Sequence, residues 1–150
     1  MKRWSKLQKR IYNILDPKLD LQIHCVVYRH DGFCGEEYVP RYFVTLSGEI
    51  IFDFPKNYPV SLKQPYEERE KCFWSAVSEI SETLAKYLNA GREARMTMTD
   101  YWGIVDIIRA ADRRVGARQW TKLYESGSME VKKVIESRKS IRTSLPVSQE

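Results

Sequence analysis

The chain has 150 residues, of which 43% are hydrophobic and 30% are charged, and its formal net charge is +5. This balance is typical of a single globular domain with a hydrophobic core, and it excludes a disordered chain. No apolar run approaches the roughly 20 residues of a membrane-spanning helix, and no apolar stretch of a secretion signal follows the basic N-terminus.

An amphipathic helix is expected from about Ser5 to Leu15, because Trp4, Leu7, Ile11 and Ile14 recur at helical spacing. The pair Asp16-Pro17 ends this helix. Its other side is basic and carries Lys2, Lys6, Lys9 and Arg10. A helix lying on a membrane surface has this pattern, and so does a helix that covers a sheet. The narrow apolar face favours the helix that covers a sheet.

Three β-strands follow. Leu21–Tyr28 alternates apolar and polar residues, Asp31–Glu37 forms a loop, and Arg41–Leu46 and Glu49–Phe54 flank the dipeptide Ser47-Gly48. Two β-rich runs joined by two such residues predict a hairpin. We therefore expect an antiparallel meander of three strands.

The rest of the chain is predicted to be helical. Pro55, Pro59 and Pro65 mark an extended connector. Helices are expected over about Tyr66–Asn89, from about Asp100 to a stop at Gly116, and around Trp120. Residues 92–96 show no clear pattern. The fold class is α+β, with one domain over residues 1–127, and residues 128–150 are expected to form a marginal helix and a frayed basic tail.

The densest group of charges is the segment Asp112–Arg118. Arg109 lies three residues from both Asp106 and Asp112, so these side chains can form a ladder of ion pairs that acts as a structural clamp. The alternative is recognition, in which Arg113, Arg114 and Arg118 grip carboxylates or phosphates. We expect Lys6 and Arg10 to add to that binding surface.

Basic residues are concentrated at the two ends of the chain. Residues 1–18 hold six basic residues and one acidic residue, residues 109–150 hold ten and five, and the residues between hold nine and fourteen. The ends can pack against the acidic middle, or they can meet an acidic protein or a nucleic acid. The sequence shows no spacing of an RNA-recognition motif or a zinc finger. We therefore favour a protein partner, with nucleic acid as the alternative.

The sequence offers little support for catalysis or for a cofactor. It has no Gly-x-Ser-x-Gly elbow and no phosphate-binding loop. His24, His30, Cys34 and Glu36 lack the paired spacing of a zinc site, so no metal is expected. The other cysteines, Cys25 and Cys72, are likewise far apart, which indicates a reducing cytoplasm.

Short segments along the chain resemble a family of small bacterial proteins without an assigned activity. They are Trp4-Ser5-Lys6-Leu7, Tyr28-Arg29, the hairpin from Phe43 to Phe52 and Asp112-Arg113-Arg114-Val115-Gly116. The likeness covers about residues 1–125 and implies an α+β, cytoplasmic bacterial protein with no catalytic residues to assign. We expect a non-enzymatic binding protein, of an immunity or regulatory type, whose contact surface is the corner at Arg113, Arg114 and Arg118.

Overall fold

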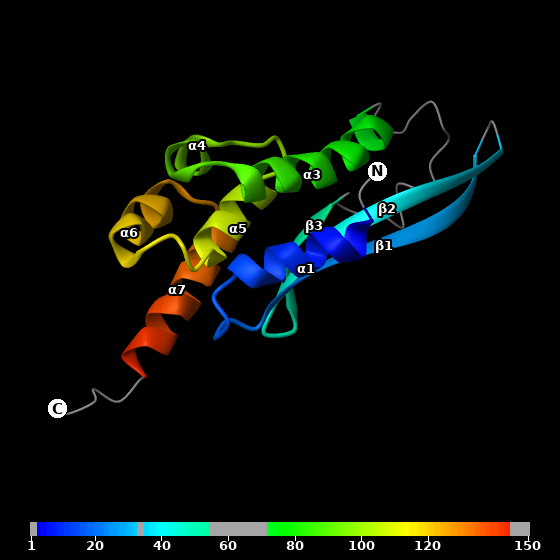
Figure 1. Ribbon diagram of the computed structural model, residues 1–150. Coiled ribbons are helices and arrows are strands. Elements are labelled where there is room, and N and C mark those ends of the chain that lie inside the picture. The colour runs from blue at the N-terminus through cyan, green and yellow to red at the C-terminus, as the bar shows by residue number, and fades with distance from the viewer. Residues whose placement is uncertain (1–2, 33–34, 55–71, 145–150) are drawn as a thin grey trace.

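The computed structural model describes residues 3–32, 35–54 and 72–144. It shows a three-stranded antiparallel sheet with helices packed on one face and a helical C-terminal half, so the expected α+β class is confirmed (Figure 1). The elements are α1 (Trp4–Ile14), β1 (Leu21–Gly32), β2 (Gly35–Leu46), β3 (Glu49–Phe54), α3 (Cys72–Asn89), α4 (Arg92–Thr97), α5 (Ile104–Ala111), α6 (Ala117–Ser126) and α7 (Met129–Thr143).

The sheet is the predicted meander, in the order β1-β2-β3. Ser47 and Gly48 both have positive φ, 51° and 81°, as the two central residues of a type I′ hairpin turn require. The first two strands are longer than expected, since Asp31 pairs with Glu36 and Gly32 with Gly35. The predicted loop over Asp31–Glu37 is therefore largely strand, and its tip, Phe33 and Cys34, lies outside the described residues.

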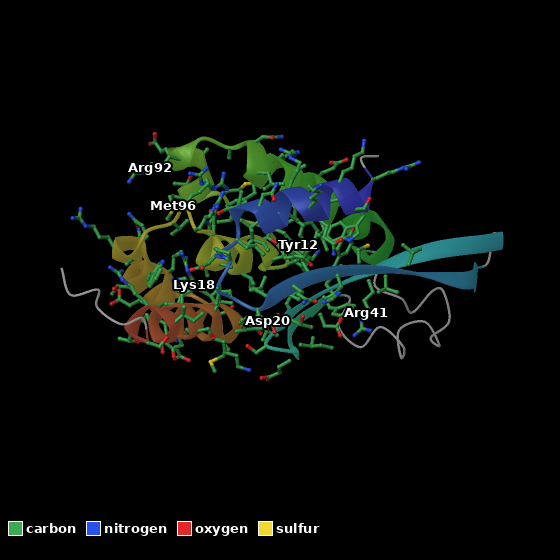
Figure 2. The ribbon with its side chains drawn as sticks, turned by 60° about the horizontal axis from the view of Figure 1, so that its bottom comes forward. Tyr12, Lys18, Asp20, Arg41, Arg92 and Met96 are labelled. Carbon is green, nitrogen blue, oxygen red and sulfur yellow. The ribbon has the colours of Figure 1, made fainter. Side chains whose placement is uncertain are left out.

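One face of the sheet forms the core with α1 and α3. Ile23 and Val44 are paired across β1 and β2 and are both fully buried. The opposite face carries polar side chains with stacked rings. The ring of His24 stacks on that of Phe43 at 4.4 Å, and Arg41 donates two hydrogen bonds to Asp53, at 2.8 and 2.6 Å. Figure 2 shows Arg41 on the side of the sheet away from α1 and α3.

Helix α1 is docked on the sheet, as expected. Leu7 and Ile11 are buried, which by itself stabilises the fold by about 1.5–3 kcal/mol for each fully buried aliphatic side chain. Gln8 and Tyr12 also bond to the backbone of Ile23 at 2.7 and 3.2 Å. None of the described helices is long and apolar enough to cross a membrane.

Helix α5 forms the centre of the helical half, and all of its residues except Asp106 are buried. The helix expected from Asp100 to Gly116 is shorter than predicted. It begins at Ile104, where the Asp100 carboxylate accepts hydrogen bonds from the backbone N–H groups of Ile104 and Val105 at 3.0 and 3.2 Å. It ends at Ala111, and Gly116 is instead the residue that precedes α6. Residues 92–97, without a clear sequence pattern, form α4.

The chain beyond Gly127 is not a marginal helix. Helix α7 runs over residues 129–143, packs along α5 and contributes the side chains of Val131, Val134 and Ile135 to the core. The sequence prediction underestimated this helix because its basic residues hide a narrow apolar face. Residues 145–150 lie outside the described part of the chain, as do the expected connector at Pro55, Pro59 and Pro65 and the expected helix start at Tyr66.

Candidate functional site

The segment Asp112–Arg118 lies where the C-terminus of α1 meets the C-terminus of α5. The backbone N–H of Asp16 donates to Ala111 O, and that of Arg113 donates to Ile14 O, both at 2.8 Å. These two bonds form a short antiparallel bridge between Leu15 and Asp112. The backbone of the segment is thereby fixed to the first helix of the chain.

The carboxylate of Asp112 is the centre of this junction and is completely buried. Its Oδ2 accepts the hydroxyl of Tyr87 at 2.9 Å, and its Oδ1 accepts the backbone N–H of Arg114 at 2.9 Å. The Arg114 guanidinium then closes a fork on the same carboxylate, with Nε 2.9 Å from Oδ1 and Nη2 2.7 Å from Oδ2. Charged fork geometry of this kind is among the strongest of protein hydrogen-bonding arrangements.

The titration of the neighbouring groups reflects this buried charge. Burial first, and the charge of Asp112 second, raise the pKa of the Tyr87 hydroxyl above its ordinary value. The hydrogen bonds to Asp112 raise the pKa of the Arg114 guanidinium. Arg114, expected among the binding residues, is therefore held against Asp112 by its guanidinium, although the residue itself is exposed.

One of the two ion pairs predicted for Arg109 is present. Arg109 pairs with Asp106, one turn earlier on α5, but Asp112 pairs with Arg114 instead of Arg109. Only 3% of Arg109 is exposed, and its guanidinium also donates to the backbone carbonyls of Arg95, at 2.9 Å, and Met98. Arg109 thus fastens α4 and the connection after it to α5.

Sequence reasoning missed Arg138, which it placed in the basic tail. In the structure Arg138 is 5% exposed and lies over the ring of Trp120, 4.5 Å from its centroid. It donates to the carbonyls of Ala110 and Asp112 at 2.8 and 3.2 Å and pairs with Asp16 at 3.3 Å. Desolvation lowers its pKa, and Asp16 opposes that shift. The sequence did contain a signal for the burial of Arg138. This residue lies three positions after Ile135 and seven after Val131, which places it on the buried face of α7.

Two arginines of the segment remain available for a partner. The side chains of Arg113 and Arg118 are exposed, and neither side chain makes a hydrogen bond or ion pair with the described residues. We call these two residues the arginine edge. The arginine edge lies on a backbone segment that contacts of Asp112, Arg114 and Arg138 hold in place.

The two predicted binding residues on α1 have different surroundings. Arg10 donates from Nη2 to Asn89 Oδ1 at 2.6 Å, at the C-terminal end of α3. The same end of α3 carries Tyr87, whose ring lies 5.9 Å from the Arg114 guanidinium. Arg10 is thus connected to the arginine-rich junction through one turn of α3. Lys6 is exposed one turn earlier on α1, and no contact within the described chain joins it to the junction.

No group of three or more His, Cys, Asp or Glu side chains that could hold a metal is found among the described residues. The side chains of His30, Cys34 and Glu36 lie outside that part of the chain, so the structure does not address the site they would form with His24.

The model of the SF0329 protein family matches residues 3–139, and the chain therefore belongs to this family. The match includes most of α7 and so extends beyond residue 125, where the resemblance was expected to end. No curated protein and no solved structure matches the chain significantly.

Proposed function

We propose that this member of the SF0329 protein family is a non-enzymatic binding protein of the bacterial cytoplasm that recognises an acidic surface of a partner protein. The contact would be made by the arginine edge, Arg113 and Arg118. The observation that carries the proposal is a contrast in pairing within one segment: the guanidinium of Arg114 is paired with the buried Asp112, while the side chains of Arg113 and Arg118 have no partner among the described residues.

The support beneath the arginine edge favours recognition. Val115 N donates to Asp112 O at 3.0 Å, and the indole of Trp120 donates to Val115 O at 3.2 Å, so the turn between α5 and α6 is braced on both sides. A braced turn loses little conformational entropy when its side chains bind. The guanidinium group suits a carboxylate because it donates two parallel hydrogen bonds. Arg10 adds a further positive charge nearby.

A protein partner is favoured over a nucleic acid because the aromatic rings at this junction are not accessible. Binding to single-stranded nucleic acids typically combines basic residues with exposed rings on which bases stack. Trp120 is only 7% exposed, and Tyr87 is buried. An immunity-type or regulatory protein, which neutralises an acidic partner by covering it, is the narrower form of the proposal. The wide spacing of the three cysteines, of which Cys25 is free, supports a reducing cytoplasm as the compartment.

The test is an affinity capture with three forms of the full chain. The wild type is compared with Arg113→Glu/Arg118→Glu and with Lys122→Glu/Arg142→Glu, a control that changes the net charge equally at other exposed positions. We expect the wild type and the control to retain the same protein after nuclease treatment, and the arginine-edge variant to lose it at an unchanged melting temperature. Equal losses in both variants would refute the proposal. A captured species that nuclease destroys would instead identify a nucleic-acid-binding protein.

A further inference from the structure

A second surface lies at the other end of α5, along β3. A groove of about 650 Å³ is bordered by β3, by the residues that precede α5 and by the start of α7. Five successive residues of β3, 50–54, line this groove. Because successive side chains of a strand point to opposite faces, a groove that touches five in a row follows the edge of the strand. That edge has no neighbouring strand within the described chain, since β3 ends the sheet and pairs with β2 alone.

Apolar side chains around this groove are unusually exposed. Ile50 is 50% exposed and Tyr101 is 86% exposed, and both line the groove. Met129, between the lining residues Ser128 and Glu130, is 67% exposed. Large apolar side chains gathered at a strand edge are typical of a surface that another chain covers.

Trp102, which lines the groove, has a buried polar atom without a partner. The indole Nε1 of Trp102 is buried, and no atom of the described chain accepts its hydrogen bond. The ring itself is held between Phe54 and Tyr101 by edge contacts, with centroids 6.2 Å apart in each case. A buried donor without an acceptor costs about 1–3 kcal/mol, so the hydrogen-bonding capacity of Trp102 is not met by the described residues.

The charge at the groove is negative. Asp53 and Glu130 line it, and Glu49 adjoins its edge. Arg41 neutralises Asp53, and Lys133 pairs with Glu49 at 3.1 Å, whereas Glu130 has no ion-pair partner among the described residues. Glu130 is therefore the acidic group left to attract a cation.

We propose that this groove binds an extended segment of a partner protein that carries a lysine or arginine, and that the segment adds a strand to the free edge of β3. Main-chain hydrogen bonds to β3 supply affinity in this mode of recognition, and side-chain contacts supply specificity. An apolar side chain of the segment packs against Ile50 and Tyr101, and its cation faces Glu130. The groove lies at the N-terminal end of α5 and the arginine edge follows its C-terminal end, so this surface is separate from the one in the proposed function.

The acidic rim argues against a second copy of this chain as the occupant. Antiparallel pairing of two β3 edges about a two-fold axis would bring the unpaired Glu130 of both copies to one interface. Like charges that face each other across an interface are unfavourable. A basic segment of another protein meets the same rim with opposite charge.

The test uses nuclear magnetic resonance of the nitrogen-15-labelled full chain with synthetic peptides at millimolar concentration. Each probe has about seven residues, capped ends and alternating valine and threonine as in a strand, and its central residue is lysine, glutamine or glutamate. With the lysine peptide, we expect chemical-shift changes for the backbone amides of residues 50–54 and for the Trp102 indole N–H. The glutamate peptide should bind more weakly, and a lysine peptide with N-methylated backbone amides should not bind.

One variant with a matched control locates the acidic contact. Glu130→Gln should weaken binding of the lysine peptide by about two- to fivefold, the range of an exposed ion pair, and leave the affinity for the glutamine peptide unchanged. Glu125→Gln, on the exposed side of α6, should change neither.

Several results would overturn the proposal. Peptide shifts at Arg113 and Arg118 instead of β3 would place binding elsewhere, and equal binding of the lysine and glutamate peptides would remove the role of Glu130. No shifts together with a concentration-dependent dimer would show that a second copy covers β3. No shifts in a monomer would show that the edge is not open. Loss of arginine-edge binding alone leaves these results unaffected, so the two proposals fail separately.

Discussion

Two adjacent arginines should respond very differently to truncation. We expect Arg114→Ala to lower the free energy of unfolding by about 2–3 kcal/mol. We expect Arg113→Ala to change it by less than about 0.5 kcal/mol, the usual range for exposed positions without partners. The reason is geometric, because Arg114 forms a fork on the completely buried carboxylate of Asp112, and Arg113 is exposed.

The magnitude follows from what remains at Asp112 when the guanidinium is removed. Removing one partner of a fully buried ion pair typically costs about 3–5 kcal/mol. Here the Arg114 side chain is 30% exposed, and Asp112 keeps two hydrogen bonds, from the Tyr87 hydroxyl and from the backbone N–H of residue 114. Both facts reduce the loss. For a chain of this length, 2–3 kcal/mol corresponds to a fall in melting temperature of roughly 4–12 °C.

The assay is urea unfolding followed by tryptophan fluorescence, with midpoints compared at equal slope. Arg114→Lys provides a second comparison, since an ammonium group cannot reproduce the two parallel hydrogen bonds and should restore only part of the stability. Equal stabilities of Arg113→Ala and Arg114→Ala would refute the reasoning. Arg114 would then not be held by Asp112, and its guanidinium would again be a candidate for contact with a partner.

Three further predictions concern the packing of α7 and the buried tyrosines. Gly127→Ala should destabilise the protein by about 1–3 kcal/mol, because the new Cβ would lie 2.5 Å from Leu123 O, whereas Gly116→Ala, with no atom within 4 Å, should melt like the wild type. Arg138→Met should cost about 3–5 kcal/mol in urea unfolding, since it leaves buried carbonyls without donors, and a loss below about 1 kcal/mol would show that the guanidinium contributes little. Burial raises the pKa of Tyr42 from 10.0 to about 12, so its contribution to stability is complete below pH 10 and is lost as the pH rises to about 12. Tyr42→Phe should flatten that decline in unfolding free energies measured across the same pH range, and an unchanged slope would contradict the assignment.

The features that the sequence predicted correctly are those set by local pattern. Leu7 and Ile11 reveal the buried face of α1 because they are one helical turn apart, and Ser47-Gly48 reveals a hairpin because few other residues adopt two successive positive φ angles. These signals need no knowledge of what packs against them. The same holds for the exposure of Arg113, which follows α5 at a surface turn.

The features that the sequence did not predict depend on contacts between distant residues. Asp112 and Tyr87 are 25 positions apart, and Arg138 reaches Asp16 across 122 positions. No local period places these side chains together. Arg109 lay at equal spacing from Asp106 and Asp112, and the choice between them was decided by Arg114, whose own backbone turns it back onto Asp112. The groove beside β3 was invisible for the same reason, because α5 and α7 complete it.

The two proposed surfaces lie at opposite ends of a helix that is almost completely buried. Helix α5 is buried on every residue but Asp106, is capped at its start by Asp100, and is tied at its end to α1 and to Arg138 of α7. A buried, close-packed helix deforms little, and α5, with its eight residues, spans about 12 Å between the residues that border the groove and the turn that leads to the arginine edge. Opposite charges at the two ends of such a helix suit partners of opposite charge, and the short distance between them requires that each partner contact a small area if both are bound together.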